Sequence, residues 1–193
     1  MDESAEPPRE DARPAPALVL LVGLPGAGKT TLARRLAAAD GLLRLTPDDW
    51  HLPLFGTSLR AEGRRDLLEG LMITTALRAL RLGTGVVLDF GLWSRDERSA
   101  LRALAAGAGA RCRVVHLPVE LDVQLERIER RRAEAVGETF PMTRADVVGW
   151  RRRFEEPDED ELAGRALPAP PPGWATWAGW AADRWPTLEV DGP

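Results

Sequence analysis

The sequence predicts an α/β fold in which a parallel sheet is covered by helices on both faces. Short apolar runs alternate with longer helical segments along the chain, and strands buried on both faces of a parallel sheet are typically continuous apolar runs. The first run ends in a glycine-rich loop, and the segment after it is rich in alanine and leucine, which favour helix. With 193 residues and 44% hydrophobic content, the chain is long enough for one domain with a proper core and short for two.

The elements follow in chain order. Residues 1–16 are rich in Asp, Glu, Pro and Arg without apolar periodicity, so we expect a disordered tail there and a single domain over 17–193. The apolar runs predict strands at 18–22, 42–45, 86–89, 113–117 and 187–190. The helical patterns predict helices at 29–39, 58–82 (one long helix or a broken pair), 94–106, 120–136 and 143–154.

Two helix starts and one connection have clear local signals. Ser94 with Glu97 forms a capping box, and Thr143 with Asp146 opens the later helix in a similar way. Residues 157–172 are acidic and then rich in proline, which predicts an exposed connection rather than a packed element.

Composition excludes several classes of protein. The net charge of -4 and the pI near 5.4 argue against a broad cationic surface for nucleic acid, although local arginine clusters are compatible with them. Cys112 is the only cysteine, so no intramolecular disulfide can form and a reducing compartment suits the chain. The apolar run 17–24 is far too short to span a bilayer. We therefore expect a cytoplasmic protein with no membrane partner.

The glycine-rich loop carries the strongest signal. Residues 23–30 match the P-loop pattern G-x-x-x-x-G-K-[ST], and Lys29 is the only lysine in the chain. In such a loop the backbone amides cradle phosphates, the lysine reaches the β and γ oxygens, and the hydroxyl after it binds magnesium. The predicted cofactors are thus ATP and Mg²⁺. The predicted nucleotide-binding residues are Gly23, Leu24, Pro25, Gly26, Ala27, Gly28, Lys29, Thr30 and Thr31.

Carboxylates follow two of the predicted strands. Asp89 closes the strand at 86–89, where it can approach magnesium beside Thr30, although a turn aspartate is the alternative. Asp48 and Asp49 follow the strand at 42–45, on the edge where ligands of open α/β sheets collect. One of the pair can accept the proton of an attacking hydroxyl, while the other can cap a helix.

Arginines gather on the helix predicted at 120–136. Arg127 and Arg131 are four residues apart and so share a face, with Arg130 and Arg132 close by. Such arginines can stabilise charge on a phosphoryl group in the transition state. The alternative is a solvated helix face on which the arginines pair with neighbouring glutamates.

Other aromatic and imidazole side chains carry weaker signals. Trp174, Trp177 and Trp180 recur at intervals of three, which favours packing over ligand stacking. His51 and His116 lack metal-ligand spacing, so the only metal expected is magnesium. His51 lies close enough to the acidic pair to touch a substrate.

Together, the loop at 23–30, Asp48 and Asp49, the strand ending at Asp89 and the arginine helix resemble the small AAA-type P-loop kinases of the zeta-toxin, chloramphenicol-phosphotransferase and polynucleotide-kinase group. The resemblance covers about residues 17–155 in element order. It implies a P-loop NTPase fold, similar to nucleotide kinases, with a five-stranded parallel sheet. It also implies Lys29 and Thr30 at ATP and magnesium, Asp48 as general base, Asp89 near the metal or the acceptor, and an arginine-rich lid around 120–136 with Arg127 and Arg131 on phosphate.

The leading functional hypothesis is an ATP-dependent phosphotransferase that moves the γ-phosphoryl group to a hydroxyl of a small molecule. Lys29, Asp48, Arg127 and Arg131 are its predicted catalytic residues, and Thr30 and Asp89 its metal side. A polynucleotide 5′-hydroxyl kinase is the first alternative, but such kinases have an arginine shortly after the acidic pair, where this chain has His51. A non-kinase ATP-binding regulatory module is the second alternative. The apolar segment 50–55 favours a small, partly apolar acceptor, within a pocket built by about residues 50–82.

Overall fold

A four-stranded parallel sheet forms the centre of the protein. The computed structural model describes residues 14–55, 64–134, 142–165 and 167–190. Within them the strands run in the order β2-β3-β1-β4, and all neighbouring pairs are parallel. The strands are β1 (Ala17–Val22), β2 (Leu43–Leu45), β3 (Val86–Gly91) and β4 (Arg111–His116).

The apolar runs become strands because both faces of the sheet are buried. Leu20 of the central strand β1 faces Leu88 of β3 on one side and Val114 of β4 on the other. Leu20 and Leu88 are fully buried. Alternate residues of β1 point to opposite faces, so Leu20 joins one hydrophobic cluster and Val19 joins another.

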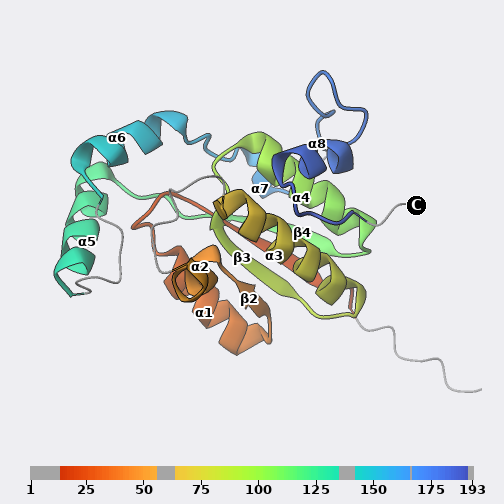
Figure 1. Ribbon diagram of the computed structural model, residues 1–193, viewed down its shortest axis with the longest axis horizontal. Helices are drawn as coiled ribbons and strands as arrows, with labels where there is room; N and C mark the ends of the chain where they lie inside the picture. Colours follow the sequence, from red (N-terminus) through yellow and green to blue (C-terminus); the bar gives the residue numbers. More distant parts are fainter. Residues whose placement is uncertain (1–13, 56–63, 135–141, 166, 191–193) are drawn as a thin grey trace, which may run out of the picture.

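Helices cover both faces, as Figure 1 shows. On one face, α3 (Arg64–Arg81), α4 (Arg95–Gly107) and α8 (Trp177–Arg184) pack over the larger cluster. On the other face, α1 (Lys29–Asp40) packs over the smaller cluster. The predicted α/β fold with helices on both faces is therefore confirmed.

The remaining helices lie at the edges of these layers. The helix α2 (Pro47–Phe55) follows β2 directly and packs against α3. The helices α5 (Leu121–Glu134) and α6 (Arg144–Arg153) extend to one side of the sheet, at the left of Figure 1. The short α7 (Glu159–Leu162) contacts β4. Among the described residues, no helix combines the length and the apolar character needed to cross a membrane.

Both predicted capping boxes are present. The Ser94 hydroxyl accepts from the Glu97 amide while the Glu97 carboxylate accepts from the Ser94 amide. Thr143 and Asp146 make the same reciprocal pair at the start of α6. The predicted segment 58–82 begins as α3 only at Arg64, after α2, while residues 56–63 and the tail over 1–13 lie outside the described part of the chain.

The fifth predicted strand was wrong. Residues 187–190 form no strand and instead pack along α3, where the Glu189 amide donates to the Thr74 hydroxyl at 2.9 Å. The Thr187 hydroxyl donates to the Leu67 carbonyl, and Leu188 is buried. Since α8 directs the chain over the helices on this face, the segment meets α3 rather than the edge of the sheet.

The prediction of an exposed connection over residues 157–172 was also wrong in part. The segment contains α7, whose Glu161 is only 2% exposed. The Glu161 carboxylate accepts from Arg98 of α4 at 2.7 and 2.9 Å, and Arg98 also donates to the carbonyls of Leu92 and Glu155. A buried guanidinium needs such partners, and they bring this acidic stretch onto α4.

Candidate functional site

The glycine-rich loop joins β1 to α1 and leaves the first amides of α1 available. Gly26 (φ 83°) and Gly28 (φ 96°) have left-handed backbones that glycine adopts without strain. A Cβ at Gly23 would lie 2.8 Å from the Leu117 carbonyl oxygen, so only glycine fits there. Gly28 caps α1 without any side-chain hydrogen bond. Free amides at the positive end of a helix dipole form an anion site.

Lys29 is enclosed at the base of this loop. Its Nζ donates to the Leu24 carbonyl at 3.0 Å. Burial lowers the pKa of Lys29 to about 8, while the carboxylates of Asp89 and Asp48 act against that decrease. Burial thus destabilises the ammonium, although Lys29 keeps its proton below about pH 8, and phosphate oxygens would supply negative charge that stabilises it.

Thr30 and Asp89 meet beside the lysine. The Thr30 hydroxyl hydrogen-bonds the Asp89 carboxylate, and burial raises the pKa of Asp89. Asp89 Oδ2 is buried without a hydrogen-bond partner among the described residues, and Arg44 Nη1 lies 3.6 Å from it. An unsatisfied buried carboxylate oxygen next to a hydroxyl is a fitting place for a hydrated divalent cation.

The described residues contain no cluster of three or more His, Cys, Asp or Glu side chains that could hold a metal by themselves. Mg²⁺ commonly binds through one or two protein oxygens and takes its other ligands from water and substrate phosphates. Thr30 and Asp89 therefore fit a magnesium ion that arrives with a nucleotide.

The two aspartates after β2 have different surroundings. Asp48 lines a cavity of about 490 Å³ together with Lys29, Thr30 and Asp89. Asp49 instead forms an ion pair with Arg44 and does not line this cavity. The fixed side chain of Asp49 leaves Asp48 as the member of the pair that can face a reacting hydroxyl.

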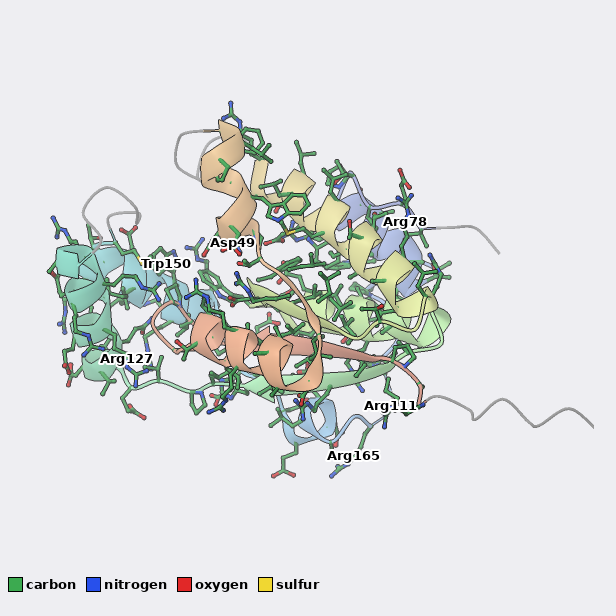
Figure 2. The ribbon with its side chains drawn as sticks, turned by 90° about the horizontal axis from the view of Figure 1, so that it is seen from below. Asp49, Arg78, Arg111, Arg127, Trp150 and Arg165 are labelled. Atoms are coloured by element: carbon green, nitrogen blue, oxygen red, sulfur yellow. The ribbon has the colours of Figure 1, made fainter. Side chains whose placement is uncertain are left out.

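The helix α5 is fixed to the outside of the glycine-rich loop. Gln124 is fully buried, and its Nε2 donates to the Pro25 carbonyl at 2.8 Å. Arg127 Nη1 donates to the Gly26 carbonyl at 3.1 Å. Arg151 of α6 donates to Gln124 Oε1 at 2.9 Å and so fixes α6 to α5. Figure 2 shows Arg127 and Trp150 of these two helices at the same end of the molecule.

A second cavity, of about 610 Å³, lies on the α5 side of the loop. Thr31, Leu32 and Arg35 of α1 line it together with Leu117. Arginines of α5 complete it, including Arg127 and Arg131. Arg131 and Met142 line both cavities, so the two spaces meet at the loop.

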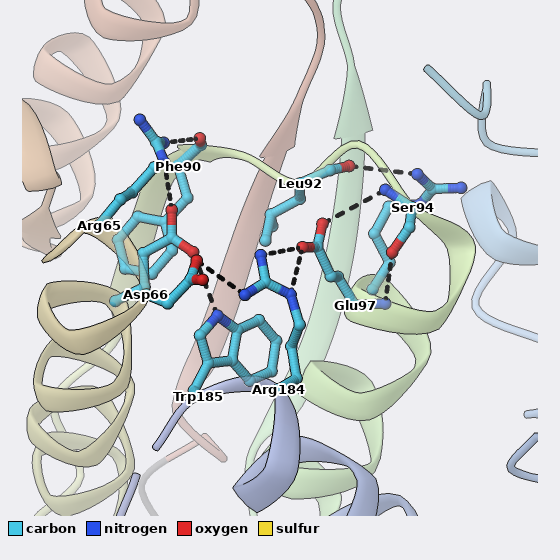
Figure 3. Close-up of polar contacts among 10 residues, drawn as sticks. Arg65, Asp66, Phe90, Leu92, Ser94, Glu97, Arg184 and Trp185 are labelled. Carbon is cyan, nitrogen blue, oxygen red and sulfur yellow. Dashed lines mark hydrogen bonds and ion pairs between the residues drawn. The ribbon is translucent and has the colours of Figure 1, made fainter. Parts of the chain in front are cut away.

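Three helices build the polar wall of the first cavity, which Figure 3 shows in close-up. Arg65 of α3 donates to the buried Glu69 at 2.7 Å and to the Phe90 carbonyl at 2.6 Å. Glu69 also accepts from the Trp185 indole at 3.1 Å, and burial raises its pKa. Arg184, at the end of α8, donates to Glu97 of α4 at 2.8 Å.

Comparison with known proteins decides the family. The family described as the AAA domain matches residues 18–157 of this chain. The chain belongs to the AAA domain family.

Curated relatives of this AAA domain protein include a GTPase and an adenylate kinase. It is 36% identical over 117 residues to GTPase Der of Rhizobium leguminosarum bv. trifolii (strain WSM2304), which covers 52% of this chain and 24% of that protein. It is 31% identical over 134 residues to adenylate kinase of Parvibaculum lavamentivorans, which covers 62% and 64%. The chain thus spans about a quarter of the length of the GTPase relatives.

Solved structures show the same fold. A candidate kinase from Chloroflexus aurantiacus j-10-fl has a TM-score of 0.62 at 22% identity and covers 91% of this chain and 100% of its own. A chain of the Pnkp1/Rnl/Hen1 RNA repair complex has a TM-score of 0.64 at 19% identity and covers 74% of this chain and 45% of its own. The family match together with these structures confirms the predicted resemblance at the level of family and fold.

The structure brings most of the predicted site residues together. Lys29, Thr30, Asp48, Asp89 and Arg131 line the first cavity. Arg127, predicted at the phosphates with Arg131, instead contacts the outside of the loop and lines only the second cavity.

The acceptor side differs from the sequence-based expectation in its chemistry. Among residues 50–55, the side chains of Trp50, Leu54 and Phe55 are exposed and line neither cavity. His51 is buried, and its ring packs against Phe55.

Charged and aromatic residues occupy the wall instead. Arg65 and Glu69 do come from the expected range, residues 50–82, but several other wall residues are more distant in sequence. These are Trp93, Glu97, Trp150 and Arg184.

Sequence reasoning missed Gln124 and Arg184. An uncharged amide within the charged segment 120–134 was the one signal that could have marked Gln124. For Arg184 no local signal exists, because its partners Glu97 and Asp66 are distant along the chain. Of the three tryptophans predicted to pack, Trp177 is buried and Trp180 contacts Trp177 and Trp185 edge-on, whereas Trp174 is exposed.

Proposed function

We propose that this protein is an ATP-dependent phosphotransferase that moves the γ-phosphoryl group of ATP to a hydroxyl of a small molecule. One observation carries the proposal: Asp48 shares a cavity with Lys29, Thr30 and Asp89, and that cavity continues past the loop to a polar wall. A protein that only binds ATP has no need of a carboxylate at this position, and one that only hydrolyses ATP has no need of the further compartment.

Each part of the site has a role in the proposal. The loop amides and Lys29 would hold the β and γ phosphates, and the second cavity would take the nucleoside, with Thr31 at the junction. Thr30 and Asp89 would hold Mg²⁺, which neutralises charge on the phosphates. Arg131 lies where the cavities meet and would stabilise charge on the transferring group.

Asp48 would act on the acceptor. As the acceptor oxygen attacks the γ phosphorus, its proton passes to the Asp48 carboxylate and the bond between that phosphorus and the bridging oxygen breaks. The bonding electrons leave with ADP. Since Asp48 is exposed while Asp89 is buried beside Thr30, Asp48 is the carboxylate better placed to accept a proton from an incoming molecule.

The test compares two neighbouring carboxylates. Hydroxyl-bearing metabolites, antibiotics and 5′-hydroxyl oligonucleotides are incubated with ATP and Mg²⁺, and mass spectrometry detects a gain of one phosphate. With the acceptor found, Asp48→Asn should keep the Kd for ATP within about twofold and lose about 10²- to 10⁴-fold in transfer. Asp49→Asn is the matched control, because Asp49 pairs with Arg44 outside the cavity, and it should retain transfer.

Two results would count against parts of the proposal. Unchanged transfer in Asp48→Asn would reject Asp48 as the base, and slow ATP hydrolysis with no acceptor in the whole panel would reject the phosphotransferase in favour of the regulatory module. Lys29→Ala should weaken both ATP binding and transfer, because it removes the ammonium at the phosphates.

A further inference from the structure

The wall of the first cavity built by α3, α4 and α8 carries its charges in closed pairs. Arg65 Nε lies 2.7 Å from Glu69 Oε1. Arg184 lies 2.8 Å from Glu97 Oε1 and 2.7 Å from Asp66 Oδ1. Two arginines thus face three carboxylates, and this wall has no surplus positive charge for an anionic ligand.

The same pairs keep hydrogen-bonding capacity. A guanidinium has five N–H donors, and each carboxylate oxygen has two lone pairs. Contacts with described residues engage only three of the five donors of Arg184. They engage one of the two lone pairs on Glu97 Oε2 and one of the two on Glu69 Oε2. The wall therefore retains both donors and acceptors for a ligand. A hydroxyl donates one hydrogen bond and accepts two, so a molecule with several hydroxyls can use both.

Aromatic rings close the cavity beside the charged pairs. Trp93, which follows β3, and Trp150 of α6 both line it, with ring centroids 6.0 Å apart at 49°. The Trp93 carbonyl accepts from the Glu155 amide at 2.9 Å, which holds the chain after α6 against this loop. Indole faces provide flat apolar surface against which the C–H face of a saturated ring can pack.

From these features, and resting on the proposed function, we infer that the acceptor is a polyhydroxylated molecule without an anionic group. The Glu97–Arg184 pair binds its hydroxyls, and Trp93 and Trp150 pack against its apolar face. The cavity volume of about 490 Å³ is in the range of small-molecule sites. Glu97 and Arg184 are thus specificity-determining residues of the acceptor site.

A polynucleotide acceptor fits this wall poorly. Its 5′-terminal hydroxyl is followed by phosphodiester groups, which proteins hold with arginines and lysines that are free to pair with them. Here Arg65 and Arg184 already pair with carboxylates. Binding an anion would require a carboxylate to be displaced or left unpaired, which is costly.

The experiment compares acceptor classes by two independent measurements. The panel contains neutral sugars, cyclitols and glycosides, with D-gluconate as an anionic polyol and a 5′-hydroxyl oligothymidylate. Transfer by the wild-type protein is followed as ATP-dependent mass gain. Binding to Asp48→Asn in the presence of ADP and Mg²⁺ is followed by calorimetry, which does not depend on catalysis.

Each outcome decides one proposal or both. Neutral polyols that bind and accept phosphate support both. Neutral polyols that bind without any transfer by the wild-type protein support the acceptor class and refute the phosphotransferase. Preferred transfer to D-gluconate or the oligonucleotide refutes the acceptor class and leaves the phosphotransferase standing. A panel in which no neutral polyol binds refutes the acceptor class.

A charge-changing variant tests the wall directly. Glu97→Gln keeps the capping interaction with Ser94, since glutamine serves that position in a capping box, and it leaves Arg184 short of one negative partner. The ratio of kcat/KM for D-gluconate over a neutral sugar should rise by about fivefold. Arg184→Lys, which keeps the charge and loses the two-point contact, should raise KM for the neutral sugar while leaving the ATP affinity unchanged.

The matched control is Glu189→Gln. Glu189 pairs with Arg78 and also joins the C-terminal segment to α3. Arg78 lies far from Arg127 and Trp150 in Figure 2. The control should not alter the ratio, and an unchanged ratio in Glu97→Gln as well would refute the role of the wall in acceptor choice.

Discussion

Replacing Lys29 by methionine should make the nucleotide-free protein more stable. Burial lowers the pKa of Lys29 from the usual 10.5 to about 8, so the folded protein holds a charge that its surroundings disfavour. In the proposed function the phosphate oxygens of ATP are the partners that would offset this cost. Methionine fills similar space without a charge, and the penalty disappears together with nucleotide binding.

The magnitude follows from that pKa. A decrease from 10.5 to about 8 corresponds to about 3 kcal/mol, at ~1.4 kcal/mol for each pH unit. The hydrogen bond from Lys29 to the Leu24 carbonyl is lost and offsets about 1 kcal/mol. The side chain is partly exposed, and solvent screening reduces the penalty further. We expect a net gain of about 1–2 kcal/mol, or a rise in Tm of about 2–8 °C.

The gain should depend on pH with a definite sign. Below about pH 8 the lysine is charged in both the folded and the unfolded state, so the full penalty applies. Between about 8 and 10.5 the folded state loses its proton while the unfolded state keeps it, and wild-type stability rises relative to the variant. The difference between the two proteins should therefore be largest near pH 7 and shrink towards pH 10.

Because of the composition of the chain, the titration of Lys29 is not obscured by that of other lysines or of tyrosines. It has no tyrosine and no second lysine. Burial raises the pKa of Cys112 to about 12, so its contribution is present below its ordinary pKa and lost as pH rises, opposite in sign to that of Lys29. Because wild type and variant share Cys112, its effect cancels in the difference.

Calorimetric unfolding of both proteins at pH 7 and pH 9.5 provides the assay. Arg34→Met, an exposed change on the same helix, is the control and should stay within about 0.5 kcal/mol of wild type at both values. A Lys29→Met variant that is less stable than wild type at pH 7 would refute the reasoning, as would a difference that does not change with pH. ATP should raise the Tm of wild type and leave that of the variant unchanged.

Three further predictions concern the scaffold around the site. Arg98→Met leaves Glu161 charged and buried and should cost about 3–5 kcal/mol in urea unfolding, whereas adding Glu161→Met should recover most of that loss; a double variant as unstable as the single one would contradict the pairing. Gly23→Ala should abolish ATP binding, measured by calorimetry, because its Cβ would lie 2.8 Å from the Leu117 carbonyl oxygen; wild-type affinity would show that the loop has room to spare. Gln124→Ala removes one of the two side-chain hydrogen bonds that α5 makes to the loop and should raise the Kd for ATP by about fivefold with little change in kcat; an equal loss in kcat would place the residue in the transfer step instead.

The parts of the fold that the sequence predicted depend on local rules. Strands β1 and β3 are buried on both faces, so their apolar runs were unambiguous. The two capping boxes were predicted residue by residue, because a capping box involves only four consecutive positions. Residues 187–190 have the composition of a strand as well, but tertiary packing against α3 decides their conformation, and no local pattern records that.

The same distinction between local rules and tertiary packing applies to the site. The loop at 23–30 is one continuous segment whose spacing specifies its chemistry, so its residues were all predicted. The residues alone left the choice between Asp48 and Asp49 open, and the family resemblance indicated Asp48. The structure adds that Asp49 pairs with Arg44 while Asp48 lines the cavity. The acceptor wall comes from separate helices that meet only in the folded protein, so its members could not be found from spacing.

Glu97 shows why the sequence does not reveal a residue's role in the cavity wall even where the residue itself was predicted to cap a helix. Its Oε2 accepts from the Ser94 amide in the capping box, while its Oε1 accepts from Arg184 in the cavity wall. The capping pattern accounts for a glutamate at this position completely, so nothing in the sequence calls for a second role. A carboxylate has two oxygens, and a local rule that engages one of them leaves the other for tertiary structure to use. Here the oxygen outside the capping box, Glu97 Oε1, accepts from Arg184, which we expect to take part in selecting the acceptor.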